Sequence, residues 1–179
     1  AIGRSVYANL MEMTHDIKKQ NMKIRFIINR VADNICYAEP VGYEMIPASV
    51  RRLVRKGKSK LEASFVAETA DNKKVRIKPV LVTQKLVSHS ASASLRKKVE
   101  ELIVKNIKKL SYNDLMIEVI DHKLQSAIRK TLNKIYPLKM CEIKSMQFEK
   151  EAKAKGISQE IIQKEIEAKE MKLKEEEKK

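Results

Sequence analysis

Residues 47–79 read PASVRRLVRKGKSKLEASFVAETADNKKVRIKP and join a helical pattern to a hairpin pattern. This stretch holds ten Lys or Arg residues against three acidic ones. Near its start, Val50, Leu53 and Val54 fall at the spacing i, i+3 and i+4, while basic residues take the opposite side. Proline opens this segment and glycine follows it, as is typical of helix starts and stops. We therefore predict a helix over residues 47–56 with one apolar and one cationic face.

The second part of the stretch alternates with a period of two, which predicts an antiparallel hairpin. Its strands span residues 58–69 and 74–85, joined by the turn Ala70-Asp71-Asn72-Lys73, in which Asn72 can adopt a positive φ. Pro79 marks a bulge or edge, because proline cannot donate to the ladder. The residues expected to face inward are Leu61, Ala63, Phe65, Ala67, Val75 and Ile77, and those expected to face outward on the return strand are Lys74, Arg76 and Lys78.

On the N-terminal side, three further β-rich segments precede the helix. Residues 2–11 and 22–31 are partly alternating, and Asp33-Asn34 gives a turn signal before residues 35–39. Five strands of this kind favour a small antiparallel barrel or sandwich. The predicted fold class is α+β, with a small antiparallel β-barrel-like core flanked by helices and a C-terminal extended helix.

On the C-terminal side, the pattern becomes helical after the polar run 88–94, which we interpret as a linker. One helix carries the apolar stripe Leu95, Val99, Leu102, Ile103 and Leu110. A second begins at the capping box Ser111-Tyr112-Asn113-Asp114, and a third ends before Pro137. Residues 138–148 then alternate as a late strand that returns to the sheet.

The net charge of +15 lies entirely in the first 148 residues. Residues 1–148 hold 29 basic and 14 acidic residues, whereas residues 149–179 hold nine of each. We therefore divide the chain into a basic, polyanion-binding α+β domain at 1–148 and a charged helical tail at 149–179. So large a basic excess predicts a polyanionic partner, and nucleic acid fits better than a membrane because no segment is long and apolar enough to span one. Acidic protein partners, or a solvated basic surface without a specific ligand, are the alternatives.

Basic residues on the predicted helix and hairpin form the candidate RNA-binding set. Aromatic residues are scarce and Trp is absent, so contacts to the backbone and shape of a folded RNA are favoured over base stacking. The candidates are Arg51, Arg52, Arg55, Lys56, Lys58, Lys60, Lys74, Arg76 and Lys78. A second set on the first C-terminal helix is Arg96, Lys97 and Lys98.

The chain offers no pattern for catalysis, a cofactor or a metal. It has no Gly-rich phosphate loop and no G-x-S-x-G, and Cys36 and Cys141 make no C-x-x-C pair. Ser88, His89 and Ser90 are adjacent in a predicted loop and cannot orient one another as nucleophile and base. Two cysteines without a signal peptide in this sequence predict the reducing cytoplasm. We expect no catalytic residue, no metal ligand and no cofactor.

Several local strings are informative in combination. They are Ile2-Gly3-Arg4, Lys19-Gln20-Asn21-Met22-Lys23, Arg51-Arg52-Leu53-Val54-Arg55, Lys74-Val75-Arg76-Ile77-Lys78-Pro79-Val80 and Ile135-Tyr136-Pro137-Leu138. Together they resemble the archaeal and eukaryotic small-subunit ribosomal protein family called S-one-e, or S-three-A-e, in its archaeal form. The resemblance covers roughly residues 2–146 and rests on the combination of these strings.

This resemblance implies a structural, non-enzymatic component of the cytoplasmic ribosome. It implies a position on the platform of the small subunit, near the mRNA exit and the 3′ end of the small-subunit rRNA. The partners would be this rRNA, neighbouring small-subunit proteins and mRNA near the exit. The basic helix and hairpin would occupy family positions that meet rRNA. The alternative is a free-standing RNA-binding adaptor that recruits a partner through its C-terminal helix.

The tail beyond residue 156 is rich in Glu and Lys at helical spacing. The i, i+4 pairs are Glu160/Lys164, Glu165/Lys169, Glu170/Lys174 and Glu175/Lys179. Each such pair stabilises a helix by about 0.2 to 0.5 kcal/mol. We therefore predict a projecting helix in the tail.

Overall fold

A single antiparallel sheet organises the chain, whose computed structural model describes residues 2–32 and 35–149. Its strands are β1 (Ser5–Asn9), β2 (Met22–Ala32), β3 (Ile35–Met45), β4 (Lys60–Glu62), β5 (Phe65–Glu68), β6 (Lys74–Thr83) and β7 (Leu138–Phe148). The helices are α1 (Leu10–Thr14), α2 (Pro47–Leu53), α3 (His89–Ile107), α4 (Tyr112–Ile120) and α5 (Lys123–Leu132), with a 3-10 turn η1 (Ile17–Lys19). The α+β class is confirmed. The predicted tail helix lies outside the described residues.

The sheet is open, so the predicted barrel-like closure is not observed. The strand order is β1-β2-β3-β7-β6-β4, and β5 pairs with β6 beside β4. Within the described residues, β1 pairs only with β2 and β4 only with β6. A barrel requires its first and last strands to pair. Here β1 lies at one end of the sheet, and the short strands β4 and β5 share β6 as their partner at the other end, so among the described residues the first and last strands do not pair.

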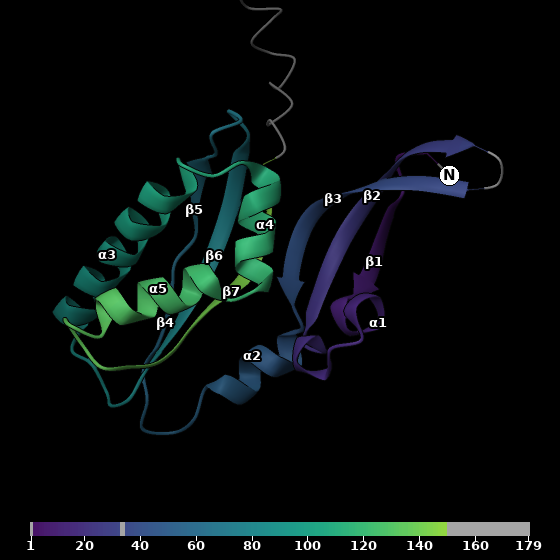
Figure 1. Cartoon of the computed structure of the whole chain (residues 1–179). Coiled ribbons are helices and arrows are strands. Elements are labelled where there is room, and N and C mark those ends of the chain that lie inside the picture. The colour runs from purple at the N-terminus through teal and green to yellow at the C-terminus, as the bar shows by residue number, and fades with distance from the viewer. Residues whose placement is uncertain (1, 33–34, 150–179) are drawn as a thin grey trace, which may run out of the picture. The chain divides into compact units, whose positions relative to one another are not determined.

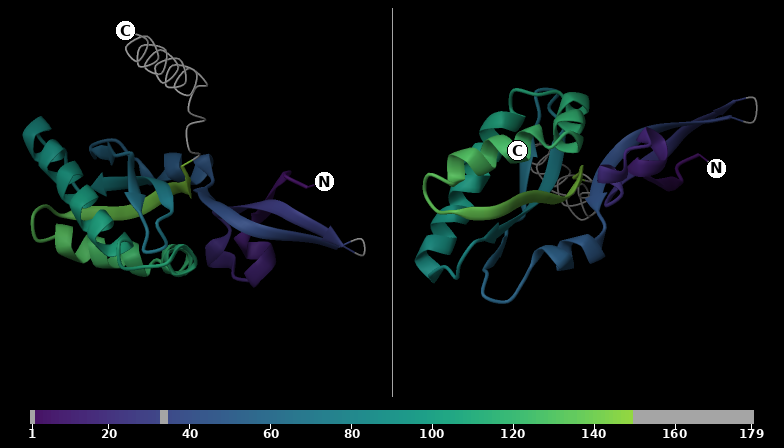
Figure 2. Two further views of the ribbon diagram at one scale, coloured as in Figure 1. Left: turned by 90° about the horizontal axis from the view of Figure 1, so that it is seen from above. Right: turned by 60° about the horizontal axis from the view of Figure 1, so that its bottom comes forward.

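Helices α3, α4 and α5 lie together on one side of strands β4 to β7 (Figures 1 and 2). Alternate residues of β6 and β7 face these helices, among them Val75, Ile77 and Met146, each with no measurable exposure. The α3 stripe supplies Leu95, Val99 and Ile103 to the same core. The inward positions predicted for the hairpin and for α3 are therefore confirmed.

The ladder between β6 and β7 changes register at Pro79, as predicted. Lys78 is opposite Ser145 but Pro79 is opposite Ile143, so Lys144 is the extra residue of a bulge in β7. The hairpin turn also follows its prediction, since Asn72 has a φ of 56°. Asparagine tolerates this left-handed conformation better than most residues.

Helix α2 is shorter than the predicted helix over residues 47–56. It ends at Leu53, because Val54 adopts an extended backbone with φ −88° and ψ 125°. Val50 and Leu53 pack against Met45 of β3 and Val80 of β6. Residues 55 and 56 consequently lie in a loop rather than on the cationic face of a helix.

Further boundaries differ from the prediction, among them residues 58–69, which form two short strands, β4 and β5, rather than one. The run 88–94 is not a linker, because α3 begins at His89 and Ser88 accepts a hydrogen bond from the Ala91 N–H at 3.4 Å. Serine hydroxyls in the first turns bond back to backbone carbonyls, as Ser92 does to His89 at 2.7 Å, and this makes a polar sequence compatible with a helix. The first predicted strand, 2–11, stops at Asn9, whose side chain caps α1.

Candidate nucleic-acid interface

The outward residues of β6 lie on the face of the sheet opposite α3, α4 and α5. Val75 and Ile77 point to the helices, so Lys74, Arg76 and Lys78 point to the other side. In register, Arg76 is opposite Gln147 and Lys78 is opposite Ser145. The structure therefore brings together, on one face, three of the cations that the hairpin pattern singled out.

Strand pairing extends this face across the sheet to residues that the sequence prediction missed. Arg25 of β2 is opposite Gly42 of β3, which is opposite Gln147 of β7. Lys23 is opposite Glu44 on the same side. Alternation with Met22, Ile24 and Phe26 was the signal that could have identified both cations. We define the basic sheet face as Lys23, Arg25, Lys60, Lys74, Arg76, Lys78 and Lys144.

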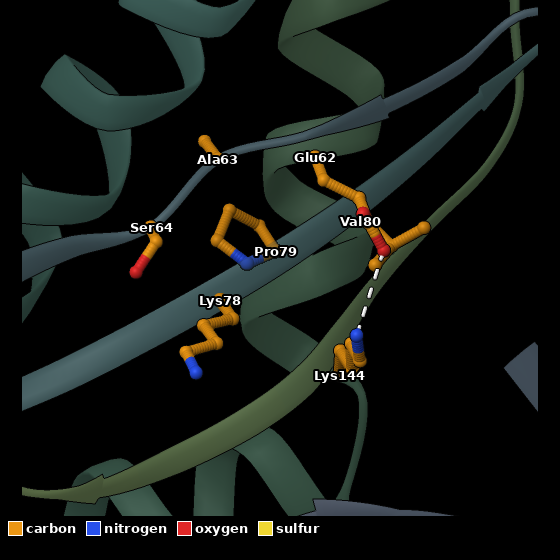
Figure 3. Close-up of a pocket in the computed structure, with 7 residues that line it drawn as sticks. All are labelled: Glu62, Ala63, Ser64, Lys78, Pro79, Val80 and Lys144. Atoms are coloured by element: carbon orange, nitrogen blue, oxygen red, sulfur yellow. Dashed lines mark ion pairs between the residues drawn. The ribbon is translucent and has the colours of Figure 1, made fainter. Parts of the chain in front are cut away.

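A hollow of about 340 Å³ opens in this face where the ladder is irregular. It lies at the bulge beside Pro79 and is lined by Glu62, Ser64, Lys78 and Lys144 among others. Figure 3 shows Lys78 extending from β6 on the side of Ser64, while Lys144 points to Glu62. The hydroxyl and the ammonium groups are donors that suit an oxygen-rich anionic ligand.

Glu62 is the acidic residue that holds two of these lysines in place. Its carboxylate lies 2.8 Å from the Lys60 ammonium and 3.7 Å from that of Lys144. The hydrogen bond from Lys60, with the nearby positive charges, lowers the pKa of Glu62 below its ordinary value. Lys74 is similarly paired, 3.8 Å from Glu68. The lysines are thus oriented by exposed ion pairs, which are weak and which phosphate groups can replace.

A second, smaller hollow of about 160 Å³ lies where β3 meets β7. Arg25 and Lys78 line it together with Tyr7 and Gly42. A Cβ on Gly42 would come within 3.1 Å of the Met146 carbonyl oxygen, so glycine permits the close approach of the two strands. Because Gly42 has no side chain, the space between Arg25 and Lys78 stays open as this hollow.

Three basic side chains gather near the start of β7. Lys58 and, more weakly, Arg55 lower the pKa of Lys139 through like-charge repulsion. Arg55 and Lys58 were predicted from the sequence, whereas Lys139 was not, because only the return of β7 places it beside them. A cluster of like charges is unfavourable unless an anion neutralises it.

Helix α2 adds its cations beside the basic sheet face. It packs over Val80, which lies on the same side of β6 as Lys78. Arg51 and Arg52 are exposed on it, and Lys56 is exposed in the loop that follows. All nine first-choice candidates therefore lie on this helix, on the loop that follows it, or on strands of the basic sheet face.

The second predicted set is separated from the others. Arg96, Lys97 and Lys98 are exposed on α3, which covers the opposite side of the sheet (Figure 2). Lys98 is paired with Glu101 at 2.9 Å. One rigid RNA segment lying on the basic sheet face would not reach them.

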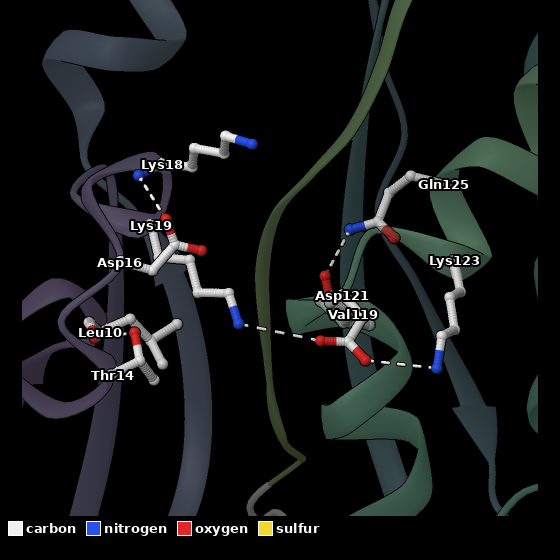
Figure 4. A network of polar contacts seen from close by, with 9 residues as sticks. All are labelled: Leu10, Thr14, Asp16, Lys18, Lys19, Val119, Asp121, Lys123 and Gln125. Carbon is white, nitrogen blue, oxygen red and sulfur yellow. Dashed lines mark hydrogen bonds and ion pairs between the residues drawn. The ribbon is translucent and has the colours of Figure 1, made fainter.

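A polar network joins the N-terminal strands to the helical layer. Lys19 of η1 lies 3.8 Å from Asp121, which also pairs with Lys123 at 3.3 Å (Figure 4). In the same junction, Gln125 is buried and donates to the Val119 carbonyl at 2.9 Å. This network positions secondary structure and lies on the helix side of the sheet.

The position of His122 in this junction predicts that the stability of the protein depends on pH. Its Nδ1 lies 3.2 Å from the Glu142 carboxylate, which raises the pKa of His122 above its ordinary value, while Lys19 opposes and Asp121 adds to the effect. Folding therefore favours the protonated ring. This stabilisation is present in full below about pH 6.5, the ordinary pKa, and is lost as the pH rises through the folded-state value.

For a pair this exposed we expect at most about 1 kcal/mol. Chemical denaturation of the wild type and of His122→Asn, measured from pH 5 to pH 8, checks this prediction. Asparagine tolerates the positive φ of 57° at this position. Equal pH dependence of both proteins would contradict the assignment of the effect to His122.

The described residues form neither a metal site nor a membrane-spanning helix. Within residues 2–32 and 35–149, no group of three or more His, Cys, Asp or Glu residues is placed to hold a metal ion. None of the helices described is long and apolar enough to cross a membrane.

Comparison with known proteins finds relatives that are ribosomal proteins, which agrees with the cationic character of the basic sheet face. Residues 1–152 match the sequence model of the Ribosomal S3Ae family. The small ribosomal subunit protein eS1 of Haloarcula marismortui is 34% identical over 148 residues, covering 83% of this chain and 70% of the relative. The protein of the same name from Methanobrevibacter smithii is 32% identical over 142 residues, covering 79% and 74%. Since the family match spans all the strands and helices described above, this chain belongs to the ribosomal S3Ae family.

Proposed function

We propose that the protein is a structural constituent of the small ribosomal subunit that binds rRNA through the basic sheet face and α2. The observation that carries the proposal is that the strands bring cations from β2, β4, β6 and β7 onto the one side of the sheet that α3–α5 leave uncovered. Fixed Lys and Arg side chains bind nucleic acid mainly by neutralising phosphates and releasing counterions. The names of the relatives support the ribosome as the place of action.

The position in the subunit, the partners and the RNA-binding domain do not follow from family membership alone. We place the protein on the platform of the subunit, near the mRNA exit and the 3′ end of the rRNA, with neighbouring ribosomal proteins and mRNA as further partners. The RNA-binding domain is residues 1–148, and no role is assigned to residues 149–179. The role is structural rather than catalytic.

Sedimentation tests the ribosomal role directly. A cell lysate is separated on a sucrose gradient at several hundred millimolar salt, and the native protein is located by immunoblotting. Migration with the small subunit is the expected result. Recovery at the top of the gradient, with intact subunits further down, would reject the proposal and leave a free RNA-binding adaptor.

The triple variant R51Q/R52Q/R55Q tests the contribution of α2 and its loop. We expect weaker binding to deproteinised small-subunit rRNA and a salt slope shallower by up to about 0.9 for each lost phosphate contact. The fold should be retained, because Arg51, Arg52 and Arg55 are exposed while Val50 and Leu53 make the packing contacts. Filter binding across a salt series measures both quantities.

A matched control uses the three cations on the other side of the sheet. The variant R96Q/K97Q/K98Q removes the same charge from an exposed helix that does not border the basic sheet face. Its affinity and salt slope should change less than those of the α2 variant. Equal losses in both variants would show a nonspecific charge effect and contradict the assignment to α2.

A further inference from the structure

Strands β2 and β3 continue beyond the rest of the sheet as a two-stranded arm. The last β2 residue paired with β1 is Ile27, opposite Ser5. Beyond Ile28, the pairs Arg30 to Tyr37, Val31 to Cys36 and Ala32 to Ile35 join the two strands to each other only, within the residues that the structure describes. Figure 1 shows this ribbon extending past the start of β1. We define the arm as residues 29–32 and 35–39.

The arm exposes apolar side chains that its own ribbon cannot bury. Ile35 is 57% exposed, Tyr37 49% and Val31 40%. An isolated two-stranded ribbon is marginally stable in water because it has no core. Ile35 and Tyr37 lie on one face, two residues apart on β3, and form an apolar surface at the end of a projecting element. This arrangement favours a partner that covers the arm.

The charge of the arm differs from that of the basic sheet face. Its described residues contain one cation, Arg30, and one anion, Glu39. The Arg30 guanidinium lies 4.7 Å from the centre of the Tyr37 ring, so it stacks on the aromatic face rather than extending outward. A neutral apolar surface offers little to phosphates, whose contacts dominate nucleic-acid affinity.

We propose that the arm docks on an apolar surface of a neighbouring small-subunit protein, while the basic sheet face binds rRNA. This inference rests on the proposed function, which supplies both kinds of neighbour. Tyrosine and arginine are among the side chains that most often dominate protein interfaces. The arm presents both, as Tyr37 and Arg30, and the exposed Ile35 adds apolar area beside them.

Site-specific photo-crosslinking distinguishes the two kinds of neighbour. A benzophenone amino acid replaces Tyr37 in one protein and Tyr7 in another, and each protein is incorporated into small subunits in cells. Tyr7 is the matched control, because it is also an exposed tyrosine, at 55%, but lines the hollow between Arg25 and Lys78. Subunits are purified by sedimentation, irradiated and treated with nuclease.

We expect the protein labelled at position 37 to give a nuclease-resistant protein–protein product, and the one labelled at position 7 to give a nuclease-sensitive rRNA product. An rRNA product at position 37, or no product there while position 7 reacts, would overturn the docking proposal and leave the ribosomal role intact. Failure of the protein to sediment with subunits at all would instead reject the proposed function.

A double substitution adds a quantitative test. The variant I35S/Y37S removes the apolar face of the arm but none of the core residues. Its retention on purified subunits after a high-salt wash should fall about tenfold or more if these residues dominate the contact. Its affinity for deproteinised rRNA should stay within about twofold of the wild type, since the cations of the basic sheet face are unchanged. Unchanged retention would contradict the proposal.

Discussion

Replacing Arg25 and Lys78 together by glutamine should weaken rRNA binding strongly. Both side chains line the hollow at Gly42, one from each side of the β3–β7 junction. A phosphate contact to a B-form duplex contributes up to about 0.9 to the slope of log K against log salt. Two lost contacts therefore predict about a sixtyfold weaker affinity at 0.1 M salt, with both proteins converging at 1 M.

Filter binding to deproteinised small-subunit rRNA across a salt series measures this effect. The control K108Q/K109Q removes two exposed lysines from the end of α3, on the other side of the sheet. It should lower the affinity far less. If the control and the R25Q/K78Q variant lose affinity equally, the basic sheet face is not the binding surface. Thermal unfolding establishes that both variants are folded.

Replacing Ile77 by alanine should produce one of the largest losses of stability among single substitutions. Ile77 has no measurable exposure, and it lies between Phe65 of β5 and Met146 of β7 in the sheet, beneath the helical layer. Truncating a buried isoleucine to alanine typically lowers the free energy of unfolding by about 2 to 5 kcal/mol. Urea denaturation monitored by circular dichroism measures the change.

The matched control is Ile117→Ala on α4. Ile117 is 55% exposed, so the same atoms are removed from a site that is already hydrated. We expect its free energy of unfolding to change by about 0.5 kcal/mol or less. Similar losses in the two variants would show that Ile77 is not a central core residue.

Local patterns in the sequence predicted much of the secondary structure. Alternation placed Val75 and Ile77 inside and Lys78 outside, and each is found there. The capping box at residues 111–114 starts α4, with Ser111 accepting from the Asp114 N–H at 3.3 Å. These features depend on residues close together in the chain, so the local sequence is sufficient to specify them.

Pairing between distant strands could not be predicted in the same way. The predicted barrel-like closure is not observed. Alternation shows that a segment is a strand but not which strand lies beside it. Lys139 and Lys144 were missed for the same reason, since their neighbours Lys58 and Glu62 come from a segment about 80 residues earlier. By contrast, Lys23 and Arg25 could have been found from alternation in β2 alone.

The position of β7 in the sheet determines when the parts of the domain can join during synthesis. The strand is formed by residues 138–148 yet lies between β3 and β6, pairing with β3 through Gly42, Tyr43 and Glu44. During synthesis, the N-terminal strands and the β4–β6 unit therefore cannot pair into one sheet until residues 138–148 have been made. Contacts of such long sequence separation slow folding. Until translation passes residue 148, the nascent chain exposes two unpaired strand edges, and early engagement by rRNA or a chaperone would protect them.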